Sequence, residues 1–189
     1  MTLLDALDAR ISTPSSQLSE PGPDHAQLLR MLRSAVRVPD HGRLTPWRFL
    51  RIAGEARGRF GEILARRCRE RDPDASNAVV EKDRQRFNQA PVVIAVVGCL
   101  HKEHRIPEVE QLLSGGSVCF ALLQAAQGMG FGAQWLTGWA AYDPGVRDAL
   151  GLAADEQILG FIHIGSVDAT APERLRPDPA GLLSDWSPA

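Results

Sequence analysis

The sequence predicts a small β-sheet covered by helices, and three observations support this fold. Apolar runs suited to strands alternate along the chain with helical patterns. The run from Pro91 to Gly98 is continuously apolar and β-branched, which favours a strand buried on both faces. Residues 107–127 form a long helical pattern that is apolar or small on nearly every side from Gly115 onward. Such a helix must be buried, and its small residues would allow a neighbouring helix to approach closely.

The other elements follow from local signals. Leucines at helical spacing predict a short helix near the N-terminus, and Asp24 with Gln27 forms a capping-box pattern. Asp143-Pro144 is a preferred start for a helix. The expected order is helix 2–11, linker 13–23, helix 24–37, strand 48–53, a helix with Phe60, Ile63, Leu64 and Cys68 on one face, peripheral polar helix 77–89, strand 91–98, polar loop 99–106, helix 107–127, strand 133–138, helix 143–151 and strand 157–165. We expect one domain over residues 1–189, with 170–189 as an extended tail.

Composition excludes several classes of protein. The chain has 189 residues and a net charge of −2, which gives no general attraction to nucleic acid or membranes. No apolar run reaches the roughly 20 residues that span a bilayer. Cys68, Cys99 and Cys119 are an odd number at wide spacing, which fits a reducing compartment and argues against a disulfide framework or a zinc site. A cytoplasmic protein is expected.

The loop from Arg37 to Trp47 carries donors and charges between two elements. Pro39 and Pro46 hold it in extended or turn geometry, because proline fixes its own φ and restricts the residue before it. Such a loop can present polar groups to a ligand. A connection with solvated charges is an equal alternative at this point.

The common catalytic motifs are absent from the sequence. Gly128, Gly130 and Gly132 resemble a dinucleotide fingerprint, but they close a helix instead of opening one. His101 and His104 lie in a polar loop without the spacing of a metal site. No nucleophile elbow or P-loop is present, so we assign no catalytic side chain and no metal.

Polar groups at the ends of buried elements suggest a bound cofactor instead. Arg10 and Ser12 supply a charge and a hydroxyl, a minimal phosphate site. Arg37 and His41 add donors, and the segment Trp135 to Gly138 offers an aromatic surface, a hydroxyl and backbone amides. These pieces suit a cofactor whose ring system performs the chemistry.

Five segments, in order along residues 2–166, together resemble the nitroreductase family, in particular its short bacterial branch of NAD(P)H nitroreductases. They are Arg-x-Ser at 10–12, Arg-x-Pro-Asp-His with Thr-Pro-Trp at 37–47, Glu110 with Ser114-Gly-Gly, Gly130-Phe-Gly and Trp135-x-Thr-Gly138.

The resemblance implies an α+β flavoprotein with a nitroreductase-like three-layer fold, a small mixed or antiparallel sheet flanked by helices. It implies a homodimer with FMN bound at the interface, and NAD(P)H as reductant. A ping-pong reaction would pass electrons to a small-molecule acceptor such as a nitroaromatic or a quinone. The alternatives are a flavin-fragmenting or other redox enzyme on this scaffold, a flavin-binding protein without turnover, and a dimeric scaffold that has lost its ligand.

The resemblance also implies site residues, carried over by position. The expected FMN contacts are Arg10, Ile11, Ser12, Arg37, His41, Trp135, Leu136 and Thr137, with Arg37 and His41 supplied by one or other subunit. The expected NAD(P)H contacts are Ala125, Ala126, Gln127, Gly128, Met129 and Gly130.

Two positions depart from the family pattern, since basic residues are usual where Ile11 and Leu136 stand. The loss of two charges would weaken binding of a phosphate-bearing cofactor, because a charge-assisted hydrogen bond contributes roughly 1.5–3 kcal/mol. Arg174 or Arg176 in the tail could compensate.

Overall fold

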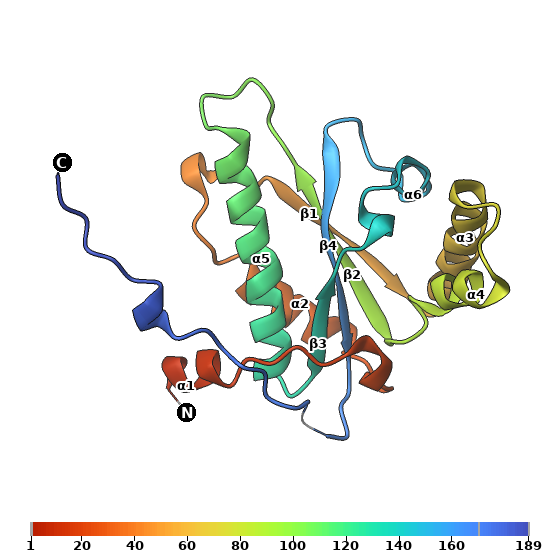
Figure 1. Ribbon diagram of the computed structural model, residues 1–189, viewed down its shortest axis with the longest axis horizontal. Helices are drawn as coiled ribbons and strands as arrows, with labels where there is room; N and C mark the ends of the chain where they lie inside the picture. The colour runs from red at the N-terminus through yellow and green to blue at the C-terminus, as the bar shows by residue number, and fades with distance from the viewer. Residues whose placement is uncertain (1, 170, 189) are drawn as a thin grey trace.

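A four-stranded antiparallel sheet forms the middle layer of the protein, with helices on both faces (Figure 1). The computed structural model describes residues 2–169 and 171–188. The strands lie in the order β1-β2-β4-β3, which confirms the predicted α+β fold. Their bounds are β1 (Trp47–Ala53), β2 (Val92–Cys99), β3 (Gly132–Leu136) and β4 (Glu156–Gly165). The helices are α1 (Leu3–Asp8), α2 (His25–Ala35), α3 (Glu55–Arg71), α4 (Asn77–Gln85), α5 (Glu108–Gly128) and α6 (Pro144–Ala149).

The central strand β2 divides the core into two halves. Ile94 packs with α2 and α5 on one face, whereas Val93 packs with α3 and α6 on the other. Successive side chains of a strand point to opposite faces, so a strand covered on both sides must be apolar throughout. This is the reason for the continuous apolar run in the sequence.

Helix starts agree with the local signals. Asp24 accepts a hydrogen bond from the Gln27 amide at 2.7 Å, and Gln27 accepts one from the Asp24 amide at 2.9 Å. This reciprocal capping box starts α2, as the sequence predicted. Asp143 caps α6 with its side chain alone, by accepting from Val146 N at 3.0 Å.

Two predicted helix ends are wrong. The first helix was expected to reach residue 11, but α1 ends at Asp8, Ala9 forms a turn and residues 10–14 have no regular structure. Thr13 N donates to Ala133 O at 3.0 Å, so this segment bonds to the edge of the sheet instead of continuing a helix. The polar helix expected to reach residue 89 ends at Gln85, and it packs firmly on α3 through Val80.

The long helix α5 is buried on only part of its surface. Val109, Leu113 and Phe120 are 59%, 66% and 42% exposed, although Cys119 and Leu122 are fully buried. The expectation that every side is covered is therefore wrong for a single chain. One apolar face remains open along the helix, and it includes Gly116, whose position has no atom near an added Cβ.

The tail is extended and exposed from residue 172 to 188, apart from a short 3₁₀ turn at Pro179–Gly181. It runs past α1 and away from the body of the protein (Figure 1). Its exposed apolar side chains are Leu175, Leu182, Leu183 and Trp186. In the part of the chain that the structure describes, none of the helices has the length and apolar character needed to span a membrane.

His163 on β4 is a buried polar residue without a hydrogen-bond partner for either ring nitrogen, among the described residues. Its ring packs 5.3 Å from that of Phe87, centre to centre. Burial, with the nearby charge of Arg86, lowers the pKa of His163 from 6.5 to about 4. The imidazole is therefore neutral at pH 7.

The stability of the protein should fall in mild acid because of His163. Below pH 6.5 the unfolded chain binds a proton here that the folded protein takes up only near pH 4, so the free energy of unfolding decreases by up to about 3 kcal/mol across that range. Urea unfolding of the wild type and His163→Phe, at pH 7.5 and 5 and one protein concentration, measures this. The wild type should lose about 2 kcal/mol more than the variant; equal losses would contradict the expectation.

Candidate functional site

The N-terminal segment 9–13 lies against the start of β3 and the end of α5. Gln127 Nε2 donates to Ala9 O at 2.6 Å, and Gln127 Oε1 accepts from Ile11 N at 3.2 Å. Arg10 N keeps a turn bond to Leu7 O at 3.1 Å, whereas Ile11 N and Thr13 N bond to Gln127 and Ala133 instead of continuing the helix. The backbone on both sides of Arg10 is thus held by Gln127.

Arg10 and Ser12 are brought together as expected. Arg10 Nη1 donates to Ser12 Oγ at 3.3 Å, and both residues are half-buried. Arg176 of the tail donates from Nη2 to Arg10 O at 3.2 Å. The same Nη2 lies 3.0 Å from Glu173 Oε1, so this guanidinium contacts the backbone next to Ile11 while it is paired with a carboxylate.

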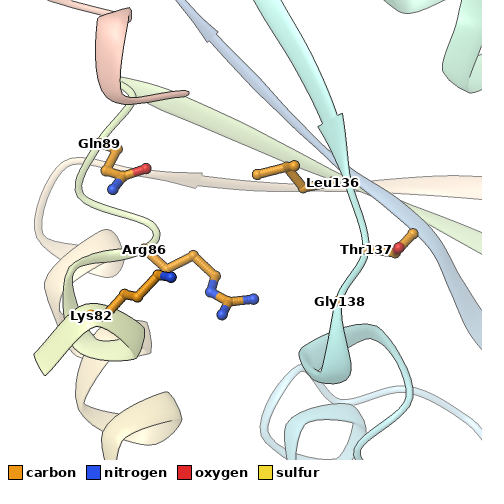
Figure 2. Close-up of a pocket in the computed structure, with 6 residues that line it drawn as sticks. All are labelled: Lys82, Arg86, Gln89, Leu136, Thr137 and Gly138. Atoms are coloured by element: carbon orange, nitrogen blue, oxygen red, sulfur yellow. The ribbon is translucent and has the colours of Figure 1, made fainter. Parts of the chain in front are cut away.

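The end of β3 opens onto a pocket of about 250 Å³. Figure 2 shows Lys82, Arg86 and Gln89 on one side of this pocket, with Leu136, Thr137 and Gly138 on the other. Gly138 has a φ of +63°, and a Cβ there would stand 2.9 Å from Arg86 Nη1. Glycine therefore lets the backbone turn after β3 while the guanidinium lies against it.

Two basic side chains, Lys82 and Arg86, line the pocket on its α4 side. Arg86 Nη2 pairs with Asp83 Oδ1 at 2.5 Å, and Trp139 Nε1 donates to Asp83 Oδ2 at 3.1 Å. Asp83 is buried, so it fixes the direction of the guanidinium. Within the described ranges Lys82 has no acidic partner, so its charge is available to a ligand.

Ser15 connects the anchoring segment to the pocket. Its backbone N donates to Gln134 Oε1 at 2.6 Å, and its Oγ donates to Gln89 Oε1 at 2.6 Å. Gln134 lies within β3 and Gln89 lines the pocket. The Arg10–Ser12 pair and the pocket therefore stand at the two ends of one edge strand.

His41 lies far from the Arg10 end of this edge. His41 Nδ1 is 2.7 Å from Glu110 Oε2, at the first turn of α5, whereas Gln127 is in its last turn. At 1.5 Å per residue, these two positions on α5 are about 25 Å apart. A single chain therefore does not bring His41 together with Arg10, and Arg37, which follows α2, lines neither pocket at β3.

The ring of Trp135 turns away from the pocket. Trp135 pairs with Ile162 in the sheet and therefore shares its α5-side face, whereas Leu136 pairs with Phe161 on the other face. The indole donates from Nε1 to Leu159 O at 3.1 Å and lies over Gly160. Only the backbone of Trp135 is near the pocket-lining residues.

The segment expected to contact NAD(P)H is the closing turn of α5. Ala126 is fully buried, and Met129 N donates to Ala125 O at 3.2 Å and to Ala126 O at 3.1 Å. Gly128 is the last residue of the helix, and Gly130 follows with a φ of +82°. Gln127 and Gly130 line a cavity of about 310 Å³ behind the N-terminal segment, with Ile11 and Thr13. None of these six residues lines the pocket at Lys82.

Sequence reasoning missed Lys82, Arg86 and Gln89. The two cations are four residues apart, which places them on one side of the helical turn that ends α4. That spacing was the available signal, but an exposed face of a peripheral helix explained it equally well. Among the described residues no group of three His, Cys, Asp or Glu side chains could hold a metal ion.

Comparisons with known proteins place the chain in a family. The model of the nitroreductase family matches residues 17–166. The curated protein of Escherichia coli (strain K12) named "Putative NAD(P)H nitroreductase YdjA" is 35% identical over 183 residues, which cover 96% of this chain and 99% of that protein.

Solved structures share the fold. A nitroreductase-like family protein from Bacillus cereus has a TM-score of 0.83 at 19% identity, covering 98% of this chain and 96% of that one. The FMN and NADPH-dependent nitroreductase NfnB from Sphigopyxis sp. strain HMH has a TM-score of 0.75 at 19% identity, covering 99% of each chain. The family match and the sequence identity across nearly the whole length agree with this fold, and this chain belongs to the nitroreductase family.

Proposed function

We propose that the protein is an FMN-dependent NAD(P)H oxidoreductase that reduces nitroaromatics, quinones or similar electron-poor acceptors. The observation that carries the proposal is the arrangement along β3. Arg10 and Ser12 offer a cation and a hydroxyl at its start, and the pocket with Lys82 and Arg86 lies at its end. Ser15 lies between them, bonded to Gln134 and Gln89. An elongated cofactor with an anionic phosphate and a polar ring matches this donor set.

The phosphate end would be held by Arg10, Ser12 and Arg176. Guanidinium groups form charge-assisted hydrogen bonds with phosphate oxygens. Arg10 contacts Ser12, and Arg176 contacts the backbone of Arg10 while it is paired with Glu173. Arg176 would supply the charge that Ile11 lacks by exchanging Glu173 for the phosphate.

The ring end would lie against Thr137, Gly138 and the cations of the pocket. Lys82 and Arg86 face Leu136 across this pocket, so they put positive charge where the family usually has a basic residue on β3. Positive charge beside the pyrimidine edge of a flavin favours the electron-rich form of the ring. When bound, FMN would take electrons from NAD(P)H and pass them to the acceptor in two half-reactions.

We propose that the active unit is a homodimer. His41 could meet the same FMN as Arg10 only if a partner chain supplied one of them, because His41 and Arg10 lie at opposite ends of α5. The open apolar face of α5 is a suitable contact surface for that partner. The exposed apolar side chains of the tail would also be covered if the tail crossed to the partner. Free cysteines favour action in the cytoplasm.

The proposed function predicts a yellow protein. Purified protein should carry the absorption of oxidised flavin, and the colour should bleach on anaerobic addition of NAD(P)H and return on addition of a nitroaromatic or a quinone. A yellow protein that NAD(P)H does not bleach would instead indicate a flavin-binding protein without turnover. Protein that stays colourless with added FMN would reject the proposal.

The tail arginines should strengthen the binding of FMN through its phosphate. Arg174→Ala with Arg176→Ala should raise the Kd for FMN by about tenfold or more, because a charge-assisted bond is lost, and leave the Kd for riboflavin unchanged. Titration by flavin fluorescence measures both constants. Arg59→Ala with Arg69→Ala on α3 is the matched control. An unchanged FMN affinity in the tail variant would reject this role.

Disrupting the open face of α5 should separate the chains. Leu113→Arg introduces a charge at an exposed leucine and should convert the dimer into monomers that do not retain FMN. Sedimentation velocity with simultaneous flavin absorbance measures both effects. Val79→Arg, at an exposed valine of α4, should leave the dimer intact. A Leu113→Arg protein that remained a yellow dimer would place the interface elsewhere.

A further inference from the structure

Gln127 is bonded to the backbone on both sides of Arg10. Its Nε2 donates to the carbonyl of the preceding residue, Ala9, and its Oε1 accepts from the amide of the following residue, Ile11. A carboxamide is suited to this task because it carries a donor and an acceptor at the same end. The identities of the two partners allow only one orientation of the amide, since a carbonyl accepts and an N–H donates.

The position of Gln127 makes this contact a rigid one. The neighbouring Ala126 is fully buried in the core beneath α5, and Leu123, one helical turn earlier, is buried as well. The side chain therefore extends from a fixed helix to a segment that has no regular structure of its own. The segment continues to Thr13, which bonds to β3, so Arg10 and Ser12 are held between two fixed points.

We propose that Gln127 is a positioning residue that preorganises Arg10 and Ser12 to receive the phosphate of FMN. This inference rests on the proposed function and deepens it, because the proposed function assigns Gln127 no role in FMN binding. Both ends of its amide already bond within the chain, at 2.6 and 3.2 Å, so a direct contact with NAD(P)H is not needed to explain the residue.

Loss of the Gln127 amide should weaken only the binding of a ligand that carries a phosphate. Without Gln127 the segment would have to be ordered when the cofactor binds, and affinity falls when that ordering accompanies binding. The ring pocket at Lys82 and Thr137 would be untouched. Loss of the amide should therefore weaken FMN but leave riboflavin, which lacks the phosphate, bound as before.

The test compares Gln127→Met with the wild type, using FMN and riboflavin as the two probes. Methionine keeps the length of the side chain and removes both hydrogen bonds. The Kd for FMN should rise about tenfold, with no change in the Kd for riboflavin. Hydrogen exchange at the Ile11 amide of the flavin-free protein should become faster. The matched control is Gln157→Met, which makes the same change in a half-buried glutamine at the opposite end of β4 from Gly165.

The outcomes of this test distinguish a failure of the positioning role of Gln127 from a failure of the proposed function. An equal loss of FMN and riboflavin affinity would show general structural support and overturn the positioning role, as would unchanged FMN affinity. A wild type that binds neither flavin would reject the proposed function itself, and the inference with it. If Gln127→Met does not fold, Gln127→Ala is measured in the same way. Hydrogen exchange at the Ile11 amide of that variant that stays as slow as in the wild type would then overturn the positioning role.

Discussion

The outer edge of β3 is the constraint on which the candidate site depends. A strand at the edge of a sheet leaves a row of unpaired backbone groups that must be covered or used. At the start of β3 the N-terminal segment covers this edge, through the bond from Thr13 to Ala133. At its end the chain turns away at Gly138 and leaves a pocket. The candidate site follows the strand from the covered end to the open one.

Charges at this edge are supplied from elements that are distant in sequence. Arg10 comes from the N-terminal segment, Arg86 follows α4, and Arg176 comes from the tail. Ile11 and Leu136 are neutral residues near the two ends of this strand. Basic side chains from other segments lie close to both, and two of them, Arg176 and Arg86, are themselves paired with Glu173 and Asp83.

The remaining strong ion pairs stabilise the fold away from this edge. Arg48 and Glu156 join β1 to β4 through two hydrogen bonds of 2.5 and 2.7 Å, and this contact lowers the pKa of Glu156 to about 2. Arg67 bonds to the buried Asp143 that caps α6, and this lowers the pKa of that carboxyl group. In each of these pairs the acidic and the basic side chain neutralise one another. Lys82, by contrast, has no acidic partner among the described residues.

The sequence by itself determined the elements and most of their starts, because these depend on neighbours within a few residues. The capping box at Asp24 and the β-branched run before Gly98 are signals of this kind. The resemblance to a family also identified Arg10 and Ser12 as a pair. Only the tertiary structure decided that Gln127 bonds across Arg10 and that Lys82 faces Thr137, since these contacts join segments separated by 55 or more residues. Hydrogen-bond partners so far apart in the chain leave no periodic pattern, and the packing of α5 and α4 against the sheet brings them together.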